Sequence, residues 1–172
     1  MIVIFDAGPL ITACKFMVQG NLVVDYLSPK CQIIIPSAVE EEVAILGASY
    51  PDGIAAGERI AKGQIQVMPV TERRWAGYLA NYALGKGELD SIELCKSSEA
   101  EALVTDDNLA FIVATRLGLR ACMLPDLVAE LAKCQKLEVS IAKNIMEVIR
   151  PRYRMGIIEH NIMRLQEVKG KC

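Results

Sequence analysis

Asp106 and Asp107 stand side by side in the segment ALVTDDNLAF (102–111). The apolar residues before them predict a buried strand, and the residues after them predict a helix. Two neighbouring carboxylates repel each other, and a turn at this place needs only one of them. The pair therefore indicates a positive charge, such as a bound cation, at the end of this strand.

Other acidic residues occupy similar places in the chain. One follows a predicted strand, three open the helix after a second strand, and two open a helix behind the glycine-bracketed turn GKG. These residues are Asp6, Glu40, Glu41, Glu42, Glu88 and Asp90. In an open parallel sheet, ligands bind outside the carboxyl ends of the strands, so these acids can converge on one edge.

Each acid also has an ordinary structural interpretation. Asp107 or Asn108 can cap the following helix, and Glu40 to Glu42 can complement a helix dipole. Asp6 fits a capping pattern less well, because Ala-Gly-Pro follows it. A cluster of buried carboxylates is strongly destabilising without a cation. Hard divalent ions that prefer oxygen ligands, Mg²⁺ or Mn²⁺, are the natural partners of such a cluster.

The rest of the composition limits the chemistry further. His160 is the single histidine, which argues against multi-histidine zinc sites and a Ser-His-Asp triad. The six cysteines include no C-x-x-C and lie mostly in apolar segments, so we expect buried free thiols. Any metal in this protein must therefore be held by carboxylates.

Short apolar strands alternate with longer helices along the chain. Strands are predicted at 2–5, 32–35, 64–69, 102–105 and 120–125, and helices between them include 21–27 and 71–83. This alternation predicts an α/β fold, a three-layer α/β/α sandwich around a mostly parallel sheet. We expect a domain at 1–135 and a C-terminal helical extension at 136–172. The apolar residues of 127–149 have helical spacing that fits either internal core or partner contacts.

Charge and hydropathy indicate a soluble, cytoplasmic protein. Hydrophobic residues make up 52% of the 172 residues, and no apolar run is long enough for a membrane span. The start MIVIFDAGPLITA lacks a basic region and so does not read as a signal peptide. The net charge is −2, but residues 143–172 carry 7 Lys and Arg against 3 Asp and Glu. That basic tail is either a surface for phosphates or an ordinary solvated helix face.

Four blocks of the sequence resemble the PIN domain family of metal-dependent ribonucleases. They are VIFDAGPLITA (3–13), IIIPSAVEEEV (33–43), LGKGELDSIELC (84–95) and LVTDDNLAFIVATRLGL (103–119). No block is specific alone, and their order and spacing carry the resemblance. It implies a sheet sandwiched between helices, in agreement with the pattern of elements. The third block is most similar to the PIN subgroup described as nucleic-acid-binding.

The resemblance implies roles for individual residues. The catalytic acids are Asp6, Glu42, Asp90 and Asp107, with Glu88 as an additional member; Asp6, Asp90, Asp107 and Asp106 hold the metal; Thr105 supports the site; Lys86 and Arg116 contact phosphates. This chain departs from many members in having Ala7 and Gly8 after the first aspartate, where others have Ser or Thr. The departure removes a hydroxyl contact and leaves the acids in place.

The expected function is hydrolysis of RNA phosphodiester bonds with Mg²⁺ or Mn²⁺, by a protein that resembles toxins of toxin–antitoxin pairs. Such members form homodimers and bind an antitoxin protein. A catalytically inactive PIN-like module that binds nucleic acid or protein is the alternative. A receiver-like phosphotransfer domain would need its acid pair after the first strand, and a HAD-type phosphatase would need D-x-D there; this chain has Asp6-Ala7-Gly8.

Overall fold

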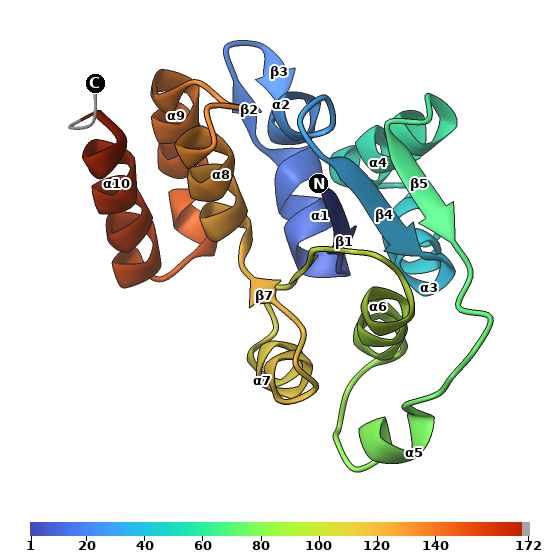
Figure 1. The fold of residues 1–172 in the computed structure, drawn as a ribbon. Coiled ribbons are helices and arrows are strands. Elements are labelled where there is room, and N and C mark those ends of the chain that lie inside the picture. The colour runs from blue at the N-terminus through green and yellow to red at the C-terminus, as the bar shows by residue number, and fades with distance from the viewer. Residues whose placement is uncertain (170–172) are drawn as a thin grey trace.

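The computed structural model describes residues 1–169 of the chain. Its centre is a parallel sheet of five strands in the order β5-β4-β1-β6-β7 (Figure 1). The strands are β1 (Ile2–Phe5), β4 (Gln32–Pro36), β5 (Ile65–Met68), β6 (Ala102–Val104) and β7 (Ala121–Cys122). The first strand lies in the middle, paired with β4 on one side and β6 on the other. This is the predicted α/β/α sandwich.

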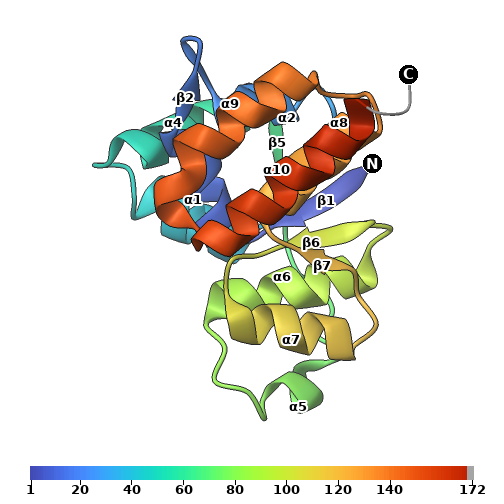
Figure 2. The ribbon, with the colours of Figure 1, turned by 90° about the vertical axis from the view of Figure 1, so that its left-hand side faces the viewer.

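Side chains of β1 alternate between two cores, one on each face of the sheet. Val3 and Phe5 belong to the larger core, and Ile4 belongs to the smaller one. Successive side chains of a strand point to opposite faces, so a strand with helices on both sides is apolar throughout. Helices on the larger core are α1 (Ala7–Lys15), α2 (Val23–Leu27), α4 (Pro51–Ala61) and α8 (Leu124–Lys133); α6 (Lys86–Ser97) and α7 (Asn108–Arg116) cover the other face (Figure 2).

The C-terminal helices extend the layer on the larger core. They are α9 (Val139–Ile149), the 3₁₀ turn η2 (Arg150–Arg152) and α10 (Met155–Lys169). The apolar side chains of α9, such as Ile145 and Ile149, are buried in the same core as β1 and α8. The interpretation of these residues as internal core is therefore confirmed, and residues on both sides of position 135 share that core.

The segment predicted as a helix at 21–27 is only partly helical. Met17–Val18 (β2) and Asn21–Leu22 (β3) form a small antiparallel hairpin, and α2 follows it. Both central residues of its turn have positive φ, 49° at Gln19 and 83° at Gly20. Positive φ at both positions is what a two-residue type I′ hairpin turn requires, and a Gln-Gly pair is a weak signal for it.

The helix predicted at 71–83 is wrong. Only Ala76–Leu79 (α5) is helical, and Leu79 is its buried residue. The segment TERRWAGYLANYA has Trp75, Tyr78, Leu79 and Tyr82 at helical spacing, but of these only Leu79 is fully buried, so burial contributes little to a longer helix. This segment instead runs as an irregular strap beyond α6 and α7 (Figure 2).

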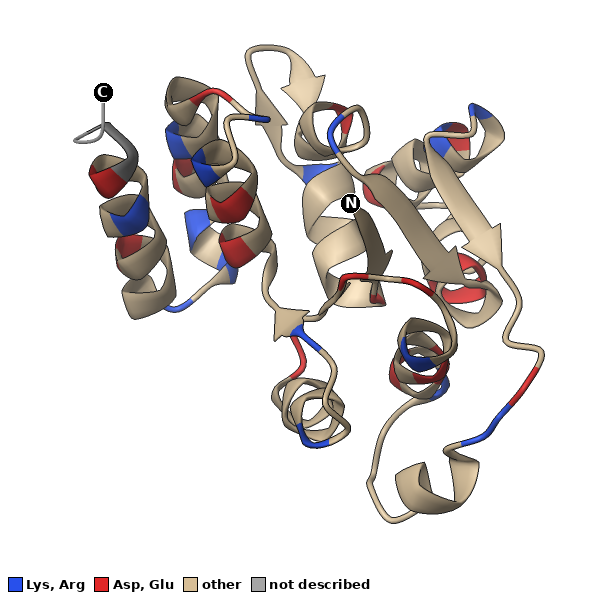
Figure 3. Cartoon of the chain, in the orientation of Figure 1, with Lys and Arg blue, Asp and Glu red and all other residues tan. Residues whose placement is uncertain are grey.

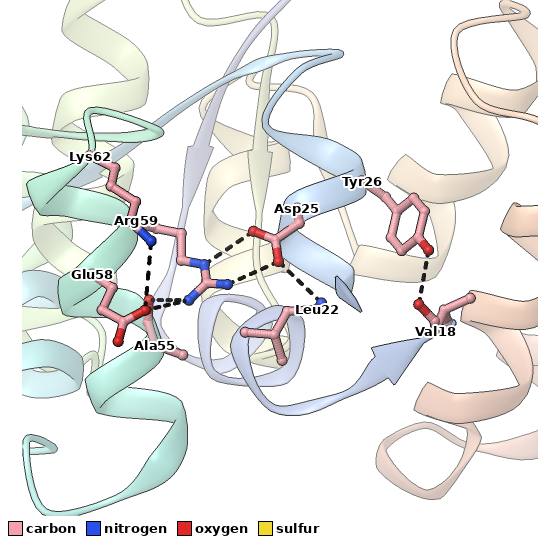
Figure 4. A network of polar contacts seen from close by, with 8 residues as sticks. All are labelled: Val18, Leu22, Asp25, Tyr26, Ala55, Glu58, Arg59 and Lys62. Atoms are coloured by element: carbon pink, nitrogen blue, oxygen red, sulfur yellow. Dashed lines mark hydrogen bonds and ion pairs between the residues drawn. The ribbon is translucent and has the colours of Figure 1, made fainter. Parts of the chain in front are cut away.

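Polar contacts hold α2 against α4 on the larger core. Arg59 Nε and Nη2 donate to the two Asp25 carboxylate oxygens at 3.1 and 2.9 Å (Figure 4). Asp25 Oδ2 also accepts from the backbone N–H of Leu22, at the start of α2. Two parallel charged hydrogen bonds of this kind fix both position and orientation.

Within residues 1–169, no helix is both long enough and apolar enough to cross a membrane. Cys14, Cys31, Cys95, Cys122 and Cys134 are free thiols, and Cys172 lies outside the described residues.

Candidate functional site

Asp6 ends the central strand and caps the helix that follows it. Its Oδ1 accepts from the backbone N–H of Ala7 at 2.9 Å, and its Oδ2 accepts from the Thr105 hydroxyl at 2.8 Å. The residue is only 4% exposed. An extended backbone conformation at Asp6 turns the chain from β1 into α1. Because β1 ends at Phe5, the next residue, Asp6, places its carboxylate at the carboxyl edge of the sheet.

The environment of Asp6 disfavours its charge. Burial raises the pKa of Asp6 from 3.8 to about 6; hydrogen bonds from Thr105 and Ala7 oppose the rise, and the charges of Glu88 and Glu42 add to it. The three carboxylates therefore lie within electrostatic reach of one another. They come from three elements far apart in the sequence.

Glu42 lies in a π-helical turn, η1 (Glu41–Ile45), directly after α3 (Ser37–Glu40). In Figure 3 the acidic residues of these turns lie beside the arrowhead of β4. Single π turns change the direction of a side chain and are frequent at functional sites. Burial, followed by the charge of Glu88, raises the pKa of Glu42.

Gly87 leaves space between two of these carboxylates. A Cβ atom there would lie 3.3 Å from Glu42 Oε2 and 3.8 Å from Asp6 Oδ1. Both oxygens thus border the first turn of α6, where unpaired backbone N–H groups favour negative charge. A glycine at this position keeps the gap between Asp6 and Glu42 open.

Glu88 and Asp90 have different surroundings. Residues two apart on an α-helix point in directions about 200° apart, so both side chains cannot face the same site. Glu88 acts on Asp6 and Glu42. Asp90 instead forms an ion pair with Arg73 at 2.6 Å. Glu88 therefore lies within electrostatic reach of Asp6, and Asp90 is engaged by Arg73.

Thr105 connects the ends of β1 and β6. Its hydroxyl donates to Asp6 and accepts from the backbone N–H of Asp107 at 3.2 Å. Asp107 Oδ1 accepts from the N–H of Ala110 at 2.7 Å and so caps α7. Asp107 is therefore fixed next to the site by one shared hydroxyl, with Oδ1 engaged by the helix.

The neighbouring Asp106 faces a different partner. The Tyr153 hydroxyl donates to its carboxylate, at 2.8 Å from Oδ2 and 3.1 Å from Oδ1. Burial raises the pKa of Asp106, while Tyr153 and Arg152 act in the opposite direction. The pairing of Asp106 with Asp107 therefore has a structural explanation that needs no cation: one aspartate holds the C-terminal segment, and the other caps a helix.

The two cations predicted to contact phosphates lie on different surfaces. Lys86 Nζ is 3.0 Å from Glu41 Oε2 in an exposed ion pair. Arg116 lies on α7 beside Tyr82. The pKa of the Tyr82 phenol is lowered, first by its hydrogen bond with Tyr78 and second by Arg116. Neither is among the residues that contribute to the raised pKa of Asp6.

The acids around Asp6 are neighbours without being a preformed ligand set. Among residues 1–169, no three His, Cys, Asp or Glu side chains converge in the arrangement of a metal site. The donors beside Gly87 are nevertheless carboxylate oxygens, which are the ligand type that a hard divalent ion prefers. Arg73 and Tyr153, which engage Asp90 and Asp106, have no local sequence signal linking them to those acids.

Comparison with known proteins identifies the family. The family model DUF3368, described as a PIN domain, matches residues 2–156, and the chain belongs to this family of nuclease-type domains. A search of the solved structures finds a domain of a functionally unknown protein from Methanocaldococcus jannaschii DSM 2661. It is 21% identical, with a TM-score of 0.45, over 72% of this chain and 90% of that chain. No curated protein matches.

Proposed function

We propose that this protein is a divalent-metal-dependent ribonuclease that hydrolyses RNA phosphodiester bonds. One observation carries the proposal: the buried Asp6 carboxylate shares its surroundings with Glu42 and Glu88. None of the ion pairs found within residues 1–169 involves any of these three carboxylates. Uncompensated charge at the carboxyl edge of a parallel sheet is costly to the fold, which makes it a candidate for chemistry.

The donor set fits Mg²⁺ or Mn²⁺. Asp6, Glu42, Glu88 and Asp107 would hold the ion through carboxylate oxygens, which these hard cations prefer. A bound ion supplies two things to such a reaction, polarisation of a phosphoryl oxygen and a lowered pKa for a bound water. Asp90, a predicted ligand, serves in this proposal to position the strap through Arg73.

The protein's own side chains prepare the site. Thr105 holds Asp6 in one orientation and ties it to the backbone of Asp107. Lys86 is held only by an exposed ion pair, which contributes little energy, so it is free to move from Glu41 to a substrate phosphate. An RNA substrate fits because its backbone brings the phosphates that the metal and Lys86 would bind. The homodimer and the antitoxin partner stay predictions.

A cleavage assay with the full chain tests this function. Mixed RNAs are incubated with wild type, Asp6→Asn and the control Asp52→Asn, each with Mg²⁺, Mn²⁺ or EDTA. We expect metal-dependent cleavage by wild type and Asp52→Asn, no cleavage in EDTA, and a loss of about 10³-fold in Asp6→Asn.

Two outcomes would count against the proposal. Full activity in a folded Asp6→Asn variant would exclude the acidic site as the catalytic one. RNA binding without cleavage in either metal would favour the alternative, a catalytically inactive binding module.

A further inference from the structure

Three aromatic side chains lie on the strap between β5 and α6. We call Trp75, Tyr78 and Tyr82 the aromatic platform. Trp75 is 37% exposed and Tyr78 is 38% exposed. The rings of Tyr78 and Tyr82 lie 5.4 Å apart between centroids at a tilt of 53°, and their hydroxyls are hydrogen-bonded at 2.9 Å. Exposed aromatic rings that are fixed by neighbours in this way offer faces for stacking.

Positive side chains lie beside the platform, one of which, Arg74, is paired with the exposed Glu72. Lys96 Nζ lies 5.4 Å from the centroid of the Trp75 ring. Arg116 lies beside Tyr82. Arg73 and Arg74 directly precede Trp75, and Figure 3 shows their positive segment on the strap before α5. Aromatic faces interleaved with cations are the combination with which proteins bind single-stranded nucleic acid.

Buried acids of α6 hold the platform in place, although most of the strap has no regular secondary structure. Glu93 Oε1 accepts from the backbone N–H of Trp75 at 2.9 Å, and Asp90 pairs with Arg73. Lys96 donates to the backbone carbonyl of Leu117 at 2.8 Å, which ties α6 to the end of α7. A surface fixed in advance loses little conformational entropy when it binds.

The platform and the acidic residues share one helix. Gly87 and Glu88 lie in the first turn of α6 beside Asp6, and Glu93 follows Gly87 by six residues. Six residues correspond to about 9 Å along a helix axis, roughly the rise of three stacked bases. Glu93 and Glu88 point in directions about 140° apart around α6, so a strand lying on the platform would pass around this helix to reach the acidic residues.

We propose that the aromatic platform stacks the bases of single-stranded RNA and leads that strand to the acidic site, with Arg74 and Arg116 contacting its phosphates. This inference rests on the proposed function. The occupant is nucleic acid rather than protein because the exposed side chains are aromatic and cationic, while the aliphatic Leu79 is buried. Of the exposed aliphatic side chains, Ile45 and Leu46 lie elsewhere, on η1 and at its end, and Ile112 lies on α7 one turn before Arg116.

Binding in EDTA tests the platform separately from cleavage. A fluorescent single-stranded RNA of mixed sequence, and the same RNA in a duplex, are titrated with the full chain and followed by anisotropy. We expect wild type to prefer the single strand. Tyr78→Leu and Trp75→Leu should each weaken single-strand binding about 10-fold, and Tyr78→Phe should keep it. Tyr50→Leu is the matched control, because Tyr50 is 63% exposed outside the strap.

Thermal unfolding checks that each variant is folded. If Trp75→Leu does not fold, Tyr78→Leu alone tests the platform. The platform is refuted if folded Tyr78→Leu binds as wild type, if Tyr50→Leu weakens binding equally, or if duplex and single strand bind alike. Platform-dependent binding without cleavage in any metal supports this inference and overturns the proposed function. Metal-dependent cleavage by wild type, together with unchanged RNA binding in Tyr78→Leu and Trp75→Leu, supports the proposed function and refutes the platform.

Discussion

The carboxylates of this protein fall into two groups with different partners. Asp25 and Asp106 accept hydrogen bonds from distant segments, from Arg59 and Tyr153, and Asp90 forms an ion pair with Arg73. The carboxylates of Asp6, Glu42 and Glu88 border one another, and although Asp6 accepts from the Thr105 hydroxyl, none of the three pairs with a cation among the described residues. The first group fastens α4, the strap and the C-terminal segment. The second group is left charged at the edge of the sheet.

This difference separates structural acids from candidate chemical ones. A carboxylate with a donor stabilises the contact that it makes, and its removal leaves the donor unpaired. A buried carboxylate among like charges raises the free energy of the folded state, as the raised pKa of Asp6 shows. A fold keeps such a residue where function requires it.

After Asp6→Asn, substitution of the two acids of α6, Glu88 and Asp90, should have the largest effect on cleavage. Glu88→Gln is expected to lower metal-dependent RNA cleavage by about 100-fold with little loss of stability, because it removes an oxygen ligand beside Asp6. Asp90→Asn should lower cleavage by less than about 10-fold, because its carboxylate faces Arg73. Initial cleavage rates at saturating Mn²⁺ measure both. A larger loss in Asp90→Asn would return Asp90 to the metal site.

Removing an acid of the paired group should act on stability instead. Asp25→Asn leaves Arg59 partly buried without its carboxylate, and we expect a loss of about 3 kcal/mol in the free energy of unfolding. Urea denaturation measures it. Cleavage per folded molecule should stay within about 2-fold of wild type. A variant as stable as wild type would show that the pair does not hold α2 and α4 together.

A smaller effect is expected where the donor is a neutral hydroxyl. Tyr153→Phe removes both hydrogen bonds to Asp106, and we expect a loss of about 1–2 kcal/mol in stability. Cleavage should change by less than about 3-fold, because the Asp106 carboxylate is engaged by Tyr153 and is not among the proposed metal ligands. Thermal unfolding and the cleavage assay check the two results. A loss of activity like that of Glu88→Gln would place Asp106 among the catalytic acids.

The sequence predicted the sheet well because its three central strands, β4, β1 and β6, are short and mostly buried apolar runs. IVIF, QIII and ALV carry their own signal, and breakers such as Pro36 end them. The strap was mispredicted because its conformation comes from distant contacts. Trp75 is held by Glu93, and Arg73 by Asp90, across 17 or 18 residues of sequence. Neither contact can be read from local propensity.

The candidate site was predictable in outline for a similar reason. Asp6 and Thr105 lie at ends of neighbouring parallel strands, so topology alone brings them together. Glu88 and Asp90 point in nearly opposite directions from α6, which their spacing shows. Which of them faces Asp6 depends on how α6 is rotated about its axis, and the spacing does not give that rotation. The partner of Asp106 was not predictable, because Tyr153 lies 47 residues away in the C-terminal segment.

Stability as a function of pH and metal tests the central claim most directly. The pKa of Asp6 is about 6 in the folded protein against 3.8 ordinarily. Its contribution to stability is therefore complete below about pH 4 and is lost as the pH rises through 6, a loss of about 3 kcal/mol in the metal-free protein. Asp6→Asn should not show this loss.

Urea denaturation at pH 5 and pH 8, with Mn²⁺ or with EDTA, gives the decisive result. We predict that Mn²⁺ stabilises wild type at pH 8, much less at pH 5, and has little effect on Asp6→Asn, because the ion binds the charged acids of the folded state. Equal stabilisation of wild type and Asp6→Asn by Mn²⁺, or none in wild type at pH 8, would contradict the account.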